Sequence, residues 1–383
     1  MSGAALRPRV GIFRTVYPLQ SETFIREQFE QYRRYAPTMI GRTWMGAGSG
    51  ESQAAVTLGT ERRSRLRQLL WSATRTPRAF PLRKLSNMKL IHAHFGPDGV
   101  MSLPLASALG VPLVTTFHGG DVTTHADKFG ASRKPTERWF AAREAELQRD
   151  GAAFIAVSRF IAARLTERGY AASKVIQHYI GVDTARFAPI DATPERRYVL
   201  CVGRHVPKKG VDTLIRAWAR IASRHPDVEL LQVGSGPLLE AHTVLARELG
   251  VESRIRFLGG QGHDRVLQLM RSAEVFALPS QTAEDGDSEA LGIVFNEASA
   301  CAVPVVSTRH GGIPEAVLHG ETGLLGEERD DAALAQHLDA VLGDRALGRR
   351  LGLRGREWVL ESFDIVTQTA KLERVYDGLI GRA

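Results

Sequence analysis

The first half of the chain alternates short apolar runs with longer amphipathic stretches. Short apolar runs predict buried strands, whereas apolar residues spaced three or four apart predict helices. The expected strands are Val10–Phe13, Thr38–Ile40, Leu90–His94, Leu113–Phe117, Phe154–Val157 and Val175–Tyr179. The expected helices lie at about 22–35, 98–109, 135–149 and 159–168. Strands that alternate with helices indicate a parallel sheet built from right-handed crossovers.

The second half of the chain repeats this alternation. Its expected strands are Tyr198–Val202, Val228–Val233, Ile255–Leu258, Val275–Leu278 and Val303–Ser307. Its expected helices lie at about 210–224, 237–249, 263–272, 289–301, 312–318, 331–342 and 345–361. Two such series predict an α/β protein with two Rossmann-like domains, each with its own parallel sheet.

A polar segment at 187–197 separates the two series. It carries two prolines and little apolar content, which is typical of a domain boundary. We therefore expect an N-terminal domain over residues 1–188 and a C-terminal domain over 196–363. An amphipathic stretch within 364–383 predicts one last helix.

The amino-acid composition is that of a globular protein. The chain has 383 residues, 43% of them hydrophobic and 24% charged, which suits two folded domains better than one core. Cys201 and Cys301 lie in apolar segments far apart, so we expect buried thiols rather than a disulfide. No apolar run approaches the roughly 18–20 residues of a membrane span, and the N-terminus lacks an apolar signal core. These features predict a cytoplasmic protein.

The charge is divided unevenly along the chain. Residues 1–190 hold 27 Lys and Arg against 14 Asp and Glu, a net charge of +13. Residues 191–383 hold 23 against 28, a net charge of −5. Such an asymmetry suggests that the first half meets an anionic surface, with nucleic acid and anionic lipid headgroups as the candidates.

Much of this positive charge is concentrated at residues 61–89, where leucines and aromatic residues interleave with it. The basic residues are Arg62, Arg63, Arg65, Arg67, Arg75, Arg78, Arg83, Lys84 and Lys89, against one acid, Glu61. Basic and apolar residues on a short helix suit an anionic membrane surface, as in a peripheral protein of the inner membrane face. A solvated loop is the alternative, and no nucleic-acid-binding motif is present.

The loop after the first strand of the second domain carries cations. Arg204 and Lys209 lie between the strand ending at Val202 and the next helix. Ligands of open α/β sheets bind at this carboxyl edge, and Arg and Lys are the usual partners of phosphate oxygens. The strand that ends at Val233 runs into a second glycine-rich turn at Gly234.

Residues 284–316 contain the most informative pattern in the chain. Two carboxylates, Glu289 and Glu297, stand eight residues apart across a turn that contains Gly292. We expect the helix to begin near Glu289, which would place both glutamates on about the same face. Turn amides and a helix N-terminus suit an anionic diphosphate, and carboxylates accept hydrogen bonds from sugar hydroxyls.

This pattern resembles the Glu-x7-Glu motif of retaining family 4 glycosyltransferases, which have the GT-B fold. The resemblance covers nearly the whole chain and is most specific at residues 198–323. It implies two Rossmann-like domains with parallel sheets that face each other across a central cleft, with a C-terminal helix that crosses back to the first domain. The Ser-Glu-Thr-Phe form at 21–24 resembles the branch that makes colanic acid and similar exopolysaccharides.

The resemblance also assigns roles in the donor site. Arg204 and Lys209 would hold the diphosphate of a UDP-, GDP- or ADP-sugar, and Glu297 would bind the ribose. Glu289 would bind the donor sugar. The backbone amides of Gly292, Ile293 and Val294 would face the sugar or diphosphate, and Gly234 would border the nucleotide. The acceptor would be a glycan or a lipid-linked glycan, and no metal is expected.

The first domain offers His118 as a candidate catalytic residue. His118 follows a buried strand and precedes Gly119, Gly120 and Asp121, so the backbone can turn sharply at the sheet edge. The segment is similar to the His-Gly-x-Asp of the family, in which the histidine approaches the donor sugar. Asp121 would orient this loop or contact the acceptor.

Three further positions near this edge are weaker candidates for acceptor contact. Many family members carry a Gly-Gly pair after the first strand, but this chain has Ser21 and Thr23 in that region instead. Asp98 follows His92 and His94, which lie on one face of a strand. The two histidines could serve a metal, but they lack a third ligand at a recognisable spacing and suit a packed strand end better.

The sequence leaves room for two other functions and one other site. Asp285 and Asp287 fit an Asp-x-Asp metal motif, which belongs to a different glycosyltransferase fold, so we expect a solvated acidic loop. A non-hydrolysing sugar-nucleotide epimerase uses the same fold. A sugar-nucleotide-binding or glycan-binding module without activity is the other rival, although Arg204, Lys209, Glu289 and Glu297 are all in place.

Overall fold

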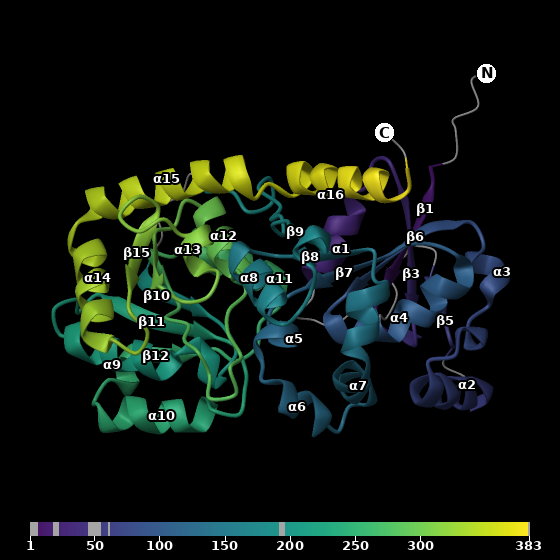
Figure 1. Cartoon of the computed structure of the whole chain (residues 1–383). Coiled ribbons are helices and arrows are strands. Elements are labelled where there is room, and N and C mark those ends of the chain that lie inside the picture. The colour runs from purple at the N-terminus through teal and green to yellow at the C-terminus, as the bar shows by residue number, and fades with distance from the viewer. Residues whose placement is uncertain (1–6, 18–22, 45–54, 60–61, 191–195, 382–383) are drawn as a thin grey trace, which may run out of the picture. The chain divides into compact units, whose positions relative to one another are not determined.

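The computed structural model describes residues 7–17, 23–44, 55–59, 62–190 and 196–381. The chain divides into two compact units (Figure 1). The first comprises residues 1–181 together with 365–383, and the second comprises 182–364. The division falls at Gly181, a few residues before the polar segment that suggested the boundary. The chain passes between the units twice, after Gly181 and after Asp364. The segments of the second unit at these two points are adjacent, because the Val182 amide donates to the Phe363 carbonyl at 2.8 Å.

The first unit is built on a parallel sheet in the order β5-β3-β1-β6-β7-β8-β9. Its strands are β1 (Arg9–Phe13), β3 (Ala36–Gly41), β5 (Ala55–Thr57), β6 (Met88–His94), β7 (Leu113–Phe117), β8 (Ala153–Ala156) and β9 (Val175–Gln177). A separate ribbon pairs β2 (Val16–Tyr17) with β4 (Thr43–Trp44). The helices are α1 (Thr23–Glu30), α2 (Arg62–Thr74), α3 (Leu82–Leu85), α4 (Gly96–Leu109), α5 (Gly120–Thr123), α6 (Ala126–Gly130), α7 (Pro135–Asp150), α8 (Arg159–Glu167) and α16 (Ile365–Leu379).

Side-chain alternation along β1 gives this sheet two buried faces. Val10 and Ile12 belong to one core cluster together with Phe29 of α1 and Leu372 of α16. Phe13 points the other way and contacts the rings of Trp71 and Phe80. Strands buried on both faces read as continuous apolar runs, and this is why the sequence predicted these strands well.

The last helix, α16, is an integral part of the first unit, as the resemblance implied. Glu373 accepts the backbone N–H groups of Arg33, Arg34 and Tyr35 at 2.8–3.2 Å, which caps the turn after α1. Tyr376 is fully buried and its hydroxyl lies 2.7 Å from that of Tyr32.

The second unit is built on a parallel sheet in the order β12-β11-β10-β13-β14-β15. Its strands are β10 (Arg197–Val202), β11 (Val228–Val233), β12 (Ile255–Phe257), β13 (Val275–Ala277), β14 (Val305–Thr308) and β15 (Gly323–Gly326). Its helices are α9 (Val211–Ile221), α10 (Leu239–Glu248), α11 (His263–Arg271), α12 (Ile293–Ala300), α13 (Ile313–Ala316), α14 (Asp331–Gly343) and α15 (Arg345–Ser362). Helix α9 packs against α10 and α14, whereas α12 packs against α11 and α15, so helices cover both faces (Figure 1).

The prediction of two Rossmann-like parallel sheets is therefore confirmed. Some expected boundaries are wrong: the helix expected at about 22–35 ends at Glu30, and α12 begins at Ile293 and not near Glu289. Gly292 has φ +76°, a left-handed conformation that no right-handed helix can include, so Glu289 lies in the loop before the helix. Strands β5 and β15 were not predicted, since they have only three and four residues, and neither were β2 and β4, which have two each.

Both cysteines are buried and free of disulfide bonds, as predicted. Burial raises the pKa of each thiol to about 12, so neither is a reactive thiolate. Among the described helices, none combines the length and the hydropathy that a membrane crossing requires.

Candidate functional site

The second unit has a topological switch point at β10. Chain order runs outward from this strand in both directions, to β11 and β12 on one side and to β13, β14 and β15 on the other. The crevice at such a point, outside the carboxyl ends of the strands, is where open α/β sheets bind ligands. The loops after β10 and β13 carry the residues that the sequence had singled out.

Two ion pairs join the loop after β10 to the loop after β13. Lys208 Nζ lies 2.9 Å from Asp287 Oδ1, and Lys209 Nζ donates to Glu289 Oε2. The Lys209 and Glu289 side chains are only 14% and 13% exposed, respectively. Arg204 on the same loop is exposed and has no ion-pair partner among the described residues, so its guanidinium is available to an anion.

Glu289 is held in the charged form by this arrangement. Burial alone would raise its pKa, but the nearby charges of Lys209 and Lys208 and the hydrogen bond from Lys209 outweigh it, and they lower the pKa from 4.5 to about 2. A charged carboxylate accepts hydrogen bonds and donates none, which suits recognition of sugar hydroxyls.

The Gly-Gly turn after β14 fixes the backbone beside Glu289. The Gly312 amide donates to the Glu289 carbonyl at 3.1 Å. A Cβ atom would lie 2.1 Å from the Glu289 oxygen if added at Gly311, and 1.9 Å from the Ala290 oxygen if added at Gly312. Only glycine therefore permits this close approach of the two loops.

Glu297 lies on α12, one to two turns from its start, and its side chain is 13% exposed. His263 Nε2 lies 3.7 Å from its carboxylate. Because Glu289 precedes the helix, the two glutamates do not share a helix face. Their relative position depends on the conformation of the loop before α12. Gly292, Ile293 and Val294 open α12, and the first amides of a helix lack intrahelical acceptors, so they remain available for an anion.

Gly234 follows β11 and permits a second close backbone approach. Its φ is +149°, and a Cβ atom there would lie 2.0 Å from the Gly203 carbonyl oxygen. The turn after β11 thus packs directly on the turn after β10, next to Arg204. The structure gives Gly234 a backbone role, and a nucleotide contact remains a prediction.

Sequence analysis missed a buried polar chain behind this turn. Gln232 Nε2 donates to the Gly203 carbonyl, which points Gln232 Oε1 at His205 Nε2, 2.6 Å away. His205 Nδ1 lies 2.7 Å from His242 Nδ1. A polar residue inside an apolar strand, Gln232 in β11, is the sequence signal that could have revealed this chain.

In the first unit, His118 stands at the carboxyl end of β7 beside a carboxylate that fixes its loop. Asp121 accepts the backbone N–H groups of Gly96, His118 and Gly119 at 2.9–3.1 Å. Burial raises the pKa of Asp121 to about 6, although these three donors oppose the shift. The structure thus gives Asp121 the loop-orienting role, one of its two predicted roles.

A row of imidazoles connects His118 to the last helix. His118 Nε2 lies 3.1 Å from His94 Nδ1, and His94 stacks on His92 at 4.5 Å between ring centroids. His92 contacts the hydroxyls of Tyr376 and Thr116 at 2.5 and 2.6 Å. Burial lowers the pKa of all three histidines, to about 3 for His92, so they are neutral. The His118 Nδ1 atom is buried without a hydrogen-bond partner among the described residues.

The weaker acceptor candidates have different surroundings. Asp98 is 2% exposed, and its carboxylate accepts from Arg14 and from the backbone and hydroxyl of Thr15, so it ties the loop after β1 to α4. Thr23 is the first residue of α1 and is half-buried. Ser21 lies outside the described residues.

The basic segment contains the helix α2, whose exposed residues include both leucines and arginines. Leu66, Leu69 and Leu70 are 73%, 66% and 53% exposed, whereas Trp71 is buried. Arg75 is buried too and pairs with Glu146 at 2.8 Å, so this arginine has a structural role. Leu69 also lines a cavity of about 470 Å³ between α2 and α7.

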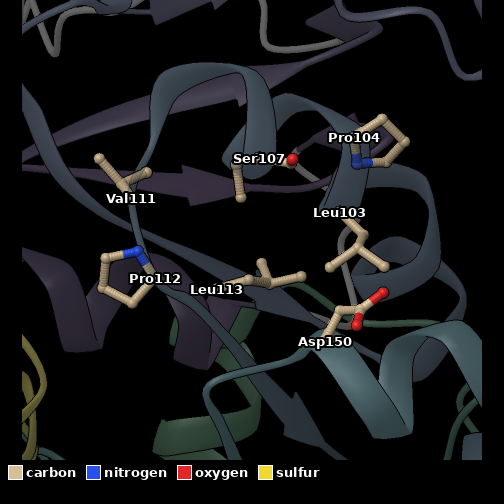
Figure 2. Close-up of a pocket in the computed structure, with 8 residues that line it drawn as sticks. Leu103, Pro104, Ser107, Val111, Pro112, Leu113 and Asp150 are labelled. Atoms are coloured by element: carbon tan, nitrogen blue, oxygen red, sulfur yellow. The ribbon is translucent and has the colours of Figure 1, made fainter.

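Figure 2 shows another cavity of the first unit, of about 380 Å³. Leu113, the first residue of β7, and Asp150, the last residue of α7, lie on its wall with Leu103 and Val111. It therefore opens at the amino end of the sheet, opposite the edge that carries His118. Asp150 is engaged by Arg149 at 2.8–2.9 Å, so this cavity offers no catalytic cluster among the described residues.

Two family models match the chain. The model described as "Glycosyl transferases group 1" matches residues 183–358, and the model described as "Glycosyltransferase Family 4" matches residues 29–186. Together they match residues 29–358.

Two curated relatives illustrate the sequence similarity. The chain is 35% identical over 298 residues to the GDP-mannose-dependent alpha-(1-6)-phosphatidylinositol monomannoside mannosyltransferase of Mycolicibacterium smegmatis, which covers 74% of this chain and 75% of the relative. It is 32% identical over 253 residues to the putative colanic acid biosynthesis glycosyltransferase WcaL of Escherichia coli, which covers 65% of this chain and 60% of the relative.

Among solved structures, Anabaena Alr3699/HepE in complex with UDP-glucose superposes with a TM-score of 0.76. The match covers 97% of this chain and all of that chain at 21% identity, so it bears on the fold alone. Neither the family models nor these relatives support an epimerase or an inactive binding module.

Proposed function

The chain belongs to glycosyltransferase family 4 and has the GT-B fold, and from this premise we propose that it moves a sugar from a nucleoside-diphosphate sugar to a lipid-linked or other glycan acceptor, with retention of anomeric configuration. The observation that carries the proposal is the pairing of Lys209 with Glu289 at the switch point of the second sheet. In the proposed function, Lys209 would bind the diphosphate and Glu289, its ion-pair partner, would bind the donor sugar.

The proposed chemistry depends on charge that develops on the leaving diphosphate. Arg204 and Lys209, with the first amides of α12, would stabilise that charge in the transition state. Lys209 has three N–H donors, so it can keep its bond to Glu289 and still reach a phosphate oxygen. Two cations and a helix N-terminus supply this stabilisation without a metal. Asp287, the metal-motif alternative, is neutralised by Lys208.

The donor is proposed to be a UDP-, GDP- or ADP-sugar. The Mycolicibacterium relative is described as GDP-mannose-dependent, and the Anabaena structure contains UDP-glucose. These two descriptions favour a nucleotide sugar and leave its base and sugar open.

We expect the purified chain to bind one nucleoside diphosphate in preference to the others without added metal. Calorimetric titration with UDP, GDP and ADP, in EDTA and then in magnesium, measures this preference. A clear metal-independent choice supports the donor site, because charge-assisted contacts from Arg204 and Lys209 need no divalent ion. Binding of none of the three would refute the assignment of these residues, and binding only with magnesium would refute the metal-free mechanism.

The acceptor is proposed to be presented at an anionic membrane surface. The outward leucines of α2 stand among exposed cations, Arg65 and Arg67, on the unit that belongs to the basic half of the chain. Exposed leucines can enter the headgroup region while neighbouring arginines contact anionic lipids. The relative that acts on a phosphatidylinositol monomannoside supports a lipid acceptor.

Replacing Leu66, Leu69 and Leu70 together by serine should weaken binding to phosphatidylglycerol-containing vesicles by roughly tenfold or more, since each buried leucine contributes about 1.5–3 kcal/mol when fully buried. Vesicle cosedimentation measures the partition. The control replaces Leu353 and Leu360, which are 49% and 45% exposed on α15 of the other unit, by serine. Equal vesicle binding by the wild type and the triple variant would exclude α2 as the membrane contact.

A further inference from the structure

The backbone of Glu289 is held by a buried imidazole from the neighbouring loop. His310 is 2% exposed and follows β14. Its Nε2 atom lies 2.9 Å from the Glu289 backbone nitrogen. A backbone amide only donates, so Nε2 must carry a lone pair and no proton.

The other ring nitrogen of His310 contacts a carboxylate. His310 Nδ1 lies 2.6 Å from Glu328 Oε1, and a carboxylate only accepts, so Nδ1 carries the proton. The two contacts select one tautomer from opposite sides of the ring, and each would be lost in the other tautomer. Sequence analysis did not single out His310 or Glu328, although His310 precedes the Gly311–Gly312 turn directly.

Glu328 is itself fixed in the charged form. The Thr282 backbone N–H donates to it at 2.7 Å and the Thr282 hydroxyl at 3.1 Å. Burial raises the pKa of Glu328, but these bonds and the one from His310 outweigh it and lower that pKa below its usual value. Thr282 lies on the loop after β13, the loop that carries Glu289, so Glu328 and His310 connect both ends of this loop to β14 and β15.

Both peptide groups of Glu289 are therefore hydrogen-bonded to the turn at residues 310–312. His310 accepts from its N–H, and the Gly312 amide donates to its carbonyl at 3.1 Å. The direction of the Glu289 side chain follows from the orientation of these two peptide groups. We propose that His310 and Glu328 are positioning residues for sugar transfer, acting as a carboxylate–imidazole relay that fixes the Glu289 loop in the geometry that recognises the donor sugar.

This inference rests on the proposed function, because it gives Glu289 the role of holding the donor sugar. A misplacement of a positioned group by about 1 Å can cost on the order of 100-fold in rate. The nucleotide should be affected far less, because Arg204 and Lys209 lie on a different loop. The relay therefore acts on kcat more than on nucleotide affinity.

The test compares four variants by turnover and by the affinity for the preferred nucleoside diphosphate. His310→Phe keeps the ring volume without an acceptor, and Glu328→Ala removes the carboxylate; each should lower kcat by roughly 30- to 100-fold with a Kd within about threefold of wild type. His310→Gln can accept from Glu289 and donate to Glu328, so it should recover most of the turnover. The control is Glu327→Ala, an exposed neighbour of Glu328.

A second readout does not depend on activity. Long-range proton–nitrogen NMR of histidine-labelled wild-type protein should show His310 protonated at Nδ1 and bare at Nε2, and Glu328→Ala should weaken this preference, because only the contact with the Glu289 amide then selects the tautomer. Wild-type turnover in His310→Phe, or an Nε2-protonated His310 in the wild type, would overturn the inference. If the wild type transferred no sugar while NMR showed the expected tautomer, the failure would lie in the proposed function and not in the relay.

Discussion

Replacing Glu289 by glutamine is expected to lower kcat for sugar transfer by roughly 100-fold or more while the affinity for the nucleoside diphosphate changes little. Glutamine keeps the size of the side chain but loses the charge that Lys209 holds in place. Glutamine has one acceptor oxygen where a carboxylate has two, and its amide nitrogen donates hydrogen bonds and cannot accept them from sugar hydroxyls. Steady-state kinetics and calorimetry with the same nucleotide separate the two effects.

Glu284→Gln is the matched control for this prediction, since Glu284 lies in the same loop and is exposed. It should leave kcat unchanged. If Glu289→Gln retained wild-type turnover, Glu289 would not hold the donor sugar. If nucleotide affinity fell as much as turnover, the substitution would have disrupted the whole site.

Replacing Lys209 by methionine is expected to destabilise the second unit by roughly 3 kcal/mol, because it leaves the Glu289 carboxylate nearly buried without its partner. Sugar transfer should fall as well, since Lys209 is also a diphosphate ligand in the proposed function. Urea unfolding at pH 7 measures the free energy of unfolding. Lys208→Met is the control, and it should cost about 1 kcal/mol, because its partner Asp287 is 26% exposed.

The double variant Lys209→Met with Glu289→Gln tests whether the unpaired carboxylate of Glu289 causes the loss of stability in Lys209→Met. Removing the carboxylate charge should restore part of the stability that Lys209→Met loses, but none of the activity. The pair also predicts a pH dependence: the pKa of Glu289 is lowered from 4.5 to about 2, so its stabilising contribution is present above pH 4.5 and is lost as the pH falls towards 2. If Lys209→Met and the double variant had the same free energy of unfolding, the charges of Lys209 and Glu289 would not be energetically coupled.

The fold could be predicted from the sequence because buried parallel strands read as continuous apolar runs. β10 and β11, for example, were predicted within a residue of their bounds. The start of α12 could not be predicted in this way. Its apolar and polar spacing continues back past Gly292, and only the positive φ at that glycine, set by packing of the loop on Gly311 and Gly312, excludes residues 289–292 from the helix.

Residues of the candidate site could be predicted only where the residue type itself indicates a binding role. Arg204, Lys209 and Glu289 stand on glycine-rich loops after strands, and the structure places Lys209 against Glu289. His310 and Glu328 were missed because they act through hydrogen bonds between residues 18 positions apart, which no local pattern encodes. Asp98 has the residue type of a ligand, yet its carboxylate is engaged by Arg14 and Thr15.

The most direct measurement follows radioactive sugar from GDP-mannose, UDP-glucose and ADP-glucose into a bacterial lipid extract, in the presence of EDTA, with the wild type and Glu289→Gln side by side. The proposed function predicts that the wild type moves label from one of these donors into the organic phase, and that Glu289→Gln does so roughly 100-fold more slowly. Label that never leaves the nucleotide, or that moves equally fast with both proteins, would contradict a donor site built on Glu289 and Lys209.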